Sequence, residues 1–169
     1  MEFKGKVKMT DAEYQAIYGW FDGNFRGIKS AERAHKYAEV FTPGWMAEKM
    51  IDEIPDCEDP TSTVFEPACG EGAFLTCVLR RKLARASGYA DKIRACQTCY
   101  GIDIQYDNVT ACRAKLVQIA MDAGVCRYDA EFIFARNIIH GDMIFFPMVA
   151  RFYDWKERRW TNLEEMANG

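Results

Sequence analysis

Three acidic residues stand where short apolar stretches of the sequence end. Glu66 follows one stretch, Asp103 follows a second and Asp142 follows a third, each close to a glycine or a proline. Ligands of parallel sheets bind beyond the carboxyl ends of the strands, so strands ending in these residues would present their carboxylates to one ligand. Carboxylates accept hydrogen bonds from hydroxyls and pair with amines. The residues therefore favour a ligand that carries hydroxyls and a positive amine.

A glycine-rich turn, Gly70-Glu71-Gly72, follows the first of these acids and precedes an apolar helical pattern. Glycines let the backbone approach a ligand closely before the helix begins. The turn is not the dinucleotide fingerprint Gly-x-Gly-x-x-Gly, because Leu75 occupies the third glycine position. Glu66 would also repel a pyrophosphate. A nucleoside with an amino-acid tail fits better, with Glu66 for the ammonium group and Asp103 for the ribose hydroxyls.

Alternating helix and strand patterns must position these residues. Thr42 is a suitable N-cap, and Pro43 a suitable first residue, for a helix that stops before Pro55. This alternation predicts an α/β fold with a parallel, doubly wound sheet. The elements expected after that helix are a buried strand over 63–65, a helix from about 73 that ends at Gly88, a strand over 99–102, a helix over about 106–123, and a third strand or its approaches within 132–134 and 137–140.

The N-terminal part of the chain is expected to form a helical cap over residues 1–40, with its second helix over about 30–40. Its aromatic residues either pack the cap on the core or stack on bases. These aromatic residues are Trp20, Phe21 and Phe25.

Two basic segments can likewise be interpreted either as structural or as contacts to nucleic acid. The expected tail, residues 147–169, interleaves basic and aromatic residues over 151–160, so it either connects elements or contacts nucleic acid. The helix after Gly72 carries basic residues that indicate a solvated face or a nucleic-acid contact. These residues are Arg80, Arg81, Lys82 and Arg85.

Composition excludes several classes of protein. The 169 residues are 49% hydrophobic and 28% charged, with a formal net charge of −3, which is typical of a globular domain and not of a generic polyanion binder. No apolar run reaches the length of a membrane span. The seven cysteines, without a visible secretory signal, indicate unpaired thiols in the reducing cytoplasm. Only Cys96 and Cys99 have a metal-ligand spacing, so no metal site is expected.

Four short segments resemble the motifs of one enzyme family, in the order that the family shows. Together they cover about residues 36–146 and resemble motifs X, I, II and III of S-adenosylmethionine-dependent amino-methylating DNA methyltransferases, most closely the N6-adenine enzymes of restriction-modification systems in the gamma-type arrangement. The segments are Phe41-Thr42-Pro43, Phe65-Glu66-Pro67-Ala68-Cys69-Gly70-Glu71-Gly72-Ala73-Phe74-Leu75, Tyr100-Gly101-Ile102-Asp103-Ile104, and Asn137-Ile138-Ile139-His140-Gly141-Asp142.

The resemblance implies a Rossmann-like class I methyltransferase fold with a partial parallel sheet, and an S-adenosylmethionine-binding domain over residues 41–146. It also implies a role for each matching residue. Phe41, Thr42 and Pro43 would line the methionine end of the cofactor; Glu66, Ala68, Cys69 and Gly70 would form the main cofactor loop; Asp103 would bond the ribose hydroxyls; Ile104 and Met143 would flank the adenine ring; and Asp142 would accept from the adenine amino group.

The catalytic motif of that family, Asn/Asp/Ser-Pro-Pro-aromatic, has no counterpart in this chain. It bonds the flipped base and directs its amino group at the methyl donor. No Pro-Pro pair occurs, since the prolines are Pro43, Pro55, Pro60, Pro67 and Pro147. We therefore assign no catalytic residue and expect the cofactor-binding portion of an adenine-N6 DNA methyltransferase, inactive on its own, such as a truncated, phage or mobile-element product.

The expected partners follow from the same resemblance. DNA would be reached mainly through a complementary methyltransferase half or a specificity subunit, and no membrane is expected as a partner. The alternative function is a non-catalytic module that senses S-adenosylmethionine or engages DNA or a partner. A methyltransferase with a different acceptor is a third interpretation.

Overall fold

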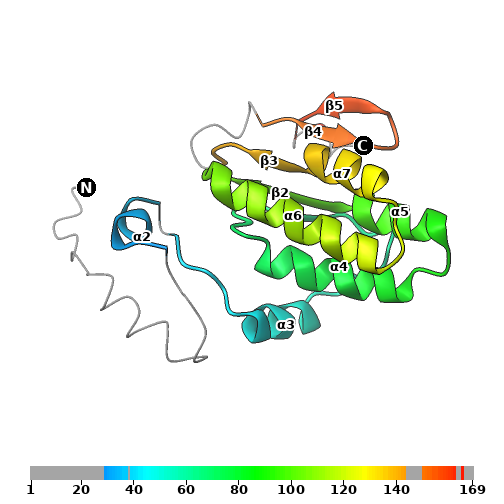
Figure 1. The fold of residues 1–169 in the computed structure, drawn as a ribbon, viewed down its shortest axis with the longest axis horizontal. Coiled ribbons are helices and arrows are strands. Elements are labelled where there is room, and N and C mark those ends of the chain that lie inside the picture. The colour runs from blue at the N-terminus through cyan, green and yellow to red at the C-terminus, as the bar shows by residue number, and fades with distance from the viewer. Residues whose placement is uncertain (1–28, 38, 144–149, 163–164, 166–169) are drawn as a thin grey trace.

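The computed structural model describes residues 29–37, 39–143, 150–162 and 165. Its centre is a three-stranded parallel sheet in the order β1-β2-β3, with helices packed beside it and a separate two-stranded antiparallel hairpin (Figure 1). The α/β class predicted from the sequence is confirmed, and the parallel sheet with flanking helices is consistent with a Rossmann-like fold. The predictions made for residues 1–28, which include those for Trp20, Phe21 and Phe25, concern residues outside the described part of the chain.

The elements agree with most of the sequence prediction, with bounds that differ by a few residues. The helix expected over about 30–40 is observed as seven residues, and Ser30 Oγ caps it by accepting a hydrogen bond from the backbone N–H of Arg33 at 3.1 Å. The bounds are α2 Ala31–Tyr37, α3 Gly44–Asp52, β1 Val64–Glu66, α4 Ala73–Arg85, α5 Tyr89–Gln97, β2 Cys99–Asp103, α6 Tyr106–Asp122, α7 Arg127–Asn137, β3 Ile138–His140, β4 Phe152–Asp154 and β5 Arg159–Thr161.

Side chains of the parallel sheet alternate between two apolar clusters, as the two-residue period of a strand requires. One face contributes Val64, Cys99 and Ile138 to the larger cluster, which is filled mainly by helical residues. The opposite face contributes Phe65, Tyr100, Ile102 and Ile139 to a second cluster, which Ala150 and Phe152 complete. Both faces of the sheet are therefore covered, but the strand β1 expected to be buried is only half-buried.

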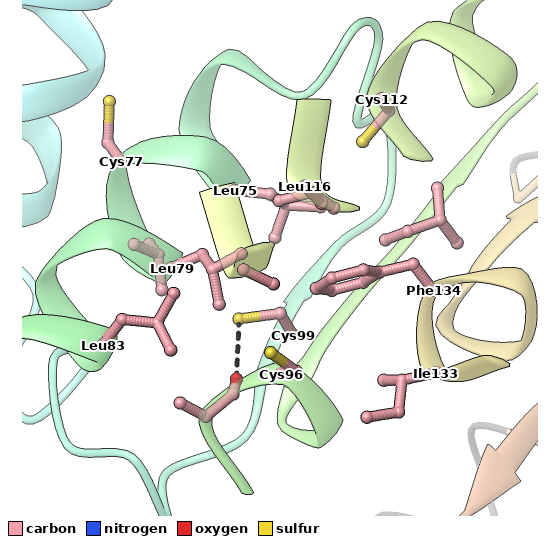
Figure 2. Packing of buried hydrophobic residues seen from close by; sticks show 14 of the residues in the cluster. Leu75, Cys77, Leu79, Leu83, Cys96, Cys99, Cys112, Leu116, Ile133 and Phe134 are labelled. Atoms are coloured by element: carbon pink, nitrogen blue, oxygen red, sulfur yellow. Dashed lines mark hydrogen bonds between the residues drawn. The ribbon is translucent and has the colours of Figure 1, made fainter. Parts of the chain in front are cut away.

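The larger cluster is where the helices meet. In Figure 2, Leu75, Leu79 and Leu83 of α4 point toward Leu116 of α6 and Phe134 of α7. Figure 1 shows α4 and α6 running side by side across the sheet. Deleting any one of these buried side chains would leave a cavity, which typically costs about 2–5 kcal/mol of stability.

Two helices were missed by the sequence prediction. α5 precedes β2 and carries few large apolar residues, so its pattern is weak. α7 includes Phe132 and Phe134, which we expected in the third strand or its approaches; only Ile138–His140 forms that strand. The buried residues of α7 do follow helical spacing, but the exposed Phe132 beside Ile133 hides that period.

The expectation of a solvated basic face on α4 is wrong for Lys82. This side chain is 0% exposed, because it follows the buried Val78 and Leu79 by one helical turn. Its Nζ donates a hydrogen bond to Thr98 Oγ1 at 2.8 Å and another to the backbone carbonyl of Ser62. Burial lowers the pKa of Lys82. The lysine therefore ties α4 to the two loops at the amino ends of β1 and β2.

The expected helix start at motif X is displaced by one residue. The cap position is Pro43, and its carbonyl accepts hydrogen bonds from the backbone N–H groups of Met46 and Ala47, each at 3.0 Å. Thr42, predicted as the N-cap, lies one residue before it and provides no side-chain cap. Because Pro43 takes a non-helical conformation at ψ 144°, the helix begins only at Gly44.

The segment expected as a connector or helical tail contains a hairpin. Phe152 of β4 is 0% exposed and packs edge-to-face on Phe65, with ring centroids 5.2 Å apart. The Tyr100 hydroxyl donates a hydrogen bond to the carbonyl of Tyr153 at 2.8 Å. The hairpin is therefore part of the layer that covers the second face of the sheet.

The expectation of free thiols is confirmed for all seven cysteines, of which only Cys126 is exposed. Burial raises the pKa of Cys96 to about 12 and that of Cys99 to about 11. No group of three or more potential metal ligands occurs among the described residues. Within the same residues, no helix is long and apolar enough to cross a membrane.

Gly101, in the middle of β2, is predicted to be intolerant of any side chain. A Cβ there would lie 2.8 Å from Leu75 Cδ1 and 2.9 Å from Cys69 Cβ. Gly101→Ala should lower the free energy of unfolding by about 1–3 kcal/mol through overpacking, measured by urea denaturation. Gly88→Ala is the matched control, because a Cβ there meets nothing within 4 Å. Equal stability of the two variants would contradict this packing.

Candidate functional site

The turn after β1 is held against the end of β2 by one carboxylate and one backbone carbonyl. Asp103 Oδ2 accepts a hydrogen bond from the backbone N–H of Gly70 at 2.9 Å. The N–H of Cys69 donates to the carbonyl of Ile102 at 3.0 Å, so the two segments are joined twice. These contacts place the glycine-rich turn directly beside Asp103, although 33 residues separate Gly70 from Asp103 along the chain.

Positive φ angles explain why glycine is needed in this turn. Gly70 has φ +52° and Gly72 has φ +83°, a region that other residues rarely adopt. A Cβ at Gly72 would also lie 2.6 Å from the sulfur of Cys112 on α6. The turn therefore bends sharply into α4 while its backbone stays in contact with α6.

Phe41 brings motif X to the same place. The nearest atoms to a Cβ built at Gly70 are those of the Phe41 ring, at 3.5 Å, so the ring packs against the turn. The ammonium group of Lys29 lies 5.5 Å from the centroid of that ring. Thr42 is half-buried and Pro43 is buried beside Phe41. The segment before α3 therefore forms one wall next to the glycine-rich turn.

Glu66 ends β1 in a half-buried position. Burial raises the pKa of Glu66, while a hydrogen bond from the backbone N–H of Ala68 lowers it by a smaller amount. The net direction is upward, so the charged form of Glu66 is destabilised in the folded protein. A cationic ligand would relieve this cost by pairing with the carboxylate.

The end of β3 joins the same edge of the sheet. The backbone N–H of Gly141 donates to the carbonyl of Asp103 at 3.0 Å, and His140 Nε2 lies 3.0 Å from the carbonyl of Ile104. Asp142 follows in a half-buried position. Ile104 is 39% exposed, so its side chain presents an apolar surface at this edge. Met143 instead packs on the second core cluster.

Charged residues that the sequence prediction missed surround this edge. Lys29 Nζ pairs with Glu71 Oε1 at 3.0 Å and with Asp107 Oδ2 at 2.8 Å. Arg33 pairs with Asp107 and with Glu39. Hydrogen bonds to Arg33 and Lys29 hold the pKa of Asp107 well below its usual range. Their partners are up to 78 positions away in the sequence, so no local pattern could have revealed these pairs.

No family model, curated protein or solved structure matches the chain. The geometry of the site therefore carries the functional argument.

Glu66→Gln is predicted to change stability with a definite dependence on pH. Because the folded-state pKa of Glu66 is raised, the ionised carboxylate costs stability once the pH rises above the unfolded value of 4.5. Glutamine removes that cost and still accepts the hydrogen bond from Ala68. The variant should be more stable than the wild type at pH 7, by less than about 1 kcal/mol.

Thermal or urea denaturation at several pH values measures this difference. The advantage of Glu66→Gln should shrink as the pH falls and vanish below 4.5, where both side chains are neutral. Glu131→Gln, an exposed carboxylate paired only with Arg127 among the contacts described, is the control and should show no such trend. A wild type that is more stable than Glu66→Gln at pH 7 would disprove the assignment of the cost to burial.

Proposed function

We propose that the chain binds S-adenosylmethionine at the carboxyl edge of its sheet and is the cofactor-binding portion of an adenine-N6 DNA methyltransferase of the restriction-modification type. In this proposal the α/β fold is that of a class I methyltransferase. The observation that carries it is the meeting of the motifs: Phe41 packs on Gly70, Gly70 bonds Asp103, and Asp103 bonds Gly141. Segments that resemble motifs X, I, II and III thus form one continuous edge.

The charge of this edge favours the proposed ligand. Glu39, Glu66, Glu71, Asp103 and Asp107 outnumber the cations that pair with them, which are Lys29, Arg33 and Lys115. S-adenosylmethionine carries a net positive charge from its sulfonium and ammonium groups, whereas a dinucleotide carries a negative diphosphate. Carboxylates at the edge therefore attract the former and repel the latter.

The chemistry of the residues present fits this cofactor. The burial cost of Glu66 is relieved by an ammonium group. In the proposal, Asp103 accepts from the ribose hydroxyls and Ile104 lies against the adenine ring. Phe41, Thr42 and Pro43 line the methionine end; Ala68, Cys69 and Gly70 form the loop beside it; and Asp142 accepts from the adenine amino group. When bound, the cofactor supplies an electrophilic methyl group.

In the proposal, this chain alone does not transfer a methyl group to adenine. Its 169 residues contain no Pro-Pro pair, so nothing in them corresponds to the loop that positions a flipped adenine. Methyl transfer would then require a complementary half or a subunit that also grips DNA. The same observation favours a second candidate function, a non-catalytic module that senses the cofactor or engages DNA or a partner.

Calorimetric titration with S-adenosylmethionine tests the binding. The wild type should bind, and Glu66→Gln and Asp103→Asn should each weaken binding by about tenfold or more, because each removes a charged hydrogen-bond acceptor. Glu131→Gln on α7 is the charge-matched control and should bind like the wild type. No binding by the folded wild type would refute the proposal, as would equal affinity of all the variants.

Radiolabelled methyl transfer to DNA separates the two candidate functions. The purified chain alone should transfer no methyl group, whereas a complementary subunit with an Asn-Pro-Pro-Tyr loop should restore transfer if the chain is a methyltransferase portion. Transfer by the chain alone would overturn the assignment of catalysis to a partner. Cofactor binding without activity in any such mixture would favour the sensing module.

A further inference from the structure

Asn108 is a buried amide that links two carboxylates near the proposed cofactor site. It lies in the first turn of α6 and is 1% exposed. Its Nδ2 donates to Asp103 Oδ1 at 3.2 Å and to Glu39 Oε1 at 2.7 Å. A primary amide nitrogen has two N–H donors, and these two carboxylates take both. Asn108 therefore fixes one oxygen of Asp103 in place.

Cations from the preceding segment determine which way the Asn108 amide points. Lys29 Nζ lies 2.6 Å from Asn108 Oδ1, and Arg33 Nη2 lies 3.5 Å from the same oxygen. The reversed amide would place its NH₂ group against two cations and its oxygen against two carboxylates. Both changes are electrostatically unfavourable, so Lys29 and Arg33 hold the donor side of Asn108 toward Asp103.

Glu39 is paired with Arg33 and accepts a hydrogen bond from Asn108, so its carboxylate does not need a ligand as a partner. Among the described residues, Arg33 Nε and Glu39 Oε2 are buried atoms that lack a hydrogen-bond partner. They belong to the same ion pair, which Arg33 Nη2 and Glu39 Oε1 already join. A side-on pairing would satisfy both atoms, as arginine and carboxylate groups commonly do. Glu39 thus acts on Asn108 as an orienting group.

The two oxygens of Asp103 consequently differ in how many hydrogen bonds they accept. Oδ1 accepts from Asn108 and from the backbone N–H of Gln105 at 2.8 Å, which uses both of its acceptor positions. Oδ2 accepts from Gly70 alone among the described hydrogen bonds. One acceptor position of Oδ2 therefore stays available for a ligand hydroxyl.

We propose that Asn108 is a positioning residue of the cofactor site: with Lys29 and Arg33 behind it, Asn108 fixes the Asp103 carboxylate so that Oδ2 accepts from a ribose hydroxyl. The inference rests on the proposed function, since it assigns a role within the same site. It extends that site to Lys29, Arg33 and Glu39, which lie before motif X.

Asn108→Asp is the variant that tests the positioning role most directly. It keeps the shape of the side chain and the oxygen that faces Lys29, but it replaces the donor NH₂ group with a negative oxygen beside Asp103 and Glu39. Gln118→Glu is the matched control, because it makes the same change from amide to carboxylate at an exposed position of α6.

The readout is a ratio of affinities, which general damage to the fold does not change. Calorimetry compares S-adenosylhomocysteine with its 2′-deoxy analogue, which lacks one ribose hydroxyl. The wild type and Gln118→Glu should prefer the ribose form by about tenfold, the value of one hydrogen bond to a charged group. In Asn108→Asp this preference should fall toward one.

Lys29→Met provides a second variant at the partly exposed start of the described chain, should Asn108→Asp fail to fold. It removes the closest cation from Asn108 Oδ1, and the preference for ribose should fall by about half or more. An unchanged preference in either folded variant would overturn the positioning role while leaving the proposed function intact. Absence of binding of both ligands to the wild type would overturn the proposed function, and the positioning role with it.

Discussion

The Asp103 carboxylate is the group on which the arrangement of this edge depends. Its two oxygens accept hydrogen bonds from the glycine-rich turn at Gly70, from its own following turn at Gln105, and from Asn108 on α6. Each of these donors belongs to a different local segment. Because a carboxylate only accepts hydrogen bonds, it can gather several donors at one point, and here it fixes the turn before α4 relative to the helix α6.

Close packing below this carboxylate makes the arrangement specific. Gly101 has no side chain, which lets Leu75 and Cys69 approach the strand β2 directly. Gly141 plays the same part beside Ile102, since a Cβ there would lie 2.9 Å from its Cδ1 atom. A larger residue at Gly101 would push the turn away from β2, and one at Gly141 would press on Ile102. The hydrogen bonds at the edge are therefore supported by the apolar core on both faces of the sheet.

The segment before motif X is held in place by ion pairs with the site, and the site is in turn oriented by cations of that segment. α2 has seven residues, too few to be stable as an isolated helix in water. Lys29, just before α2, pairs with Glu71 of the glycine-rich turn and Asp107 of α6, and Arg33 within α2 also pairs with Asp107. The surplus of carboxylates among these groups remains suited to a cationic ligand. Salt bridges of partly exposed groups contribute little stability individually, so the buried Asn108 and Glu39 give the contact its direction.

The sequence alone determined the α/β class, the places of β1 and β2 to within one residue, and the acidic residues at or just after the carboxyl ends of the strands, because period, caps and glycines act within a few residues. The third strand was only partly predicted, since residues 132–134 belong to α7. Local pattern also led to two wrong predictions. The exposed Phe132 beside Ile133 suggested a strand where the structure has a helix, and the long side chain of Lys82 was assigned to solvent although it is buried. Only the tertiary structure decided that Lys29, Arg33 and Glu39 meet at Asn108, and that Asn108 in turn contacts Asp103. Their hydrogen bonds join residues up to 79 positions apart, and such pairing is set by how the helices pack on the sheet.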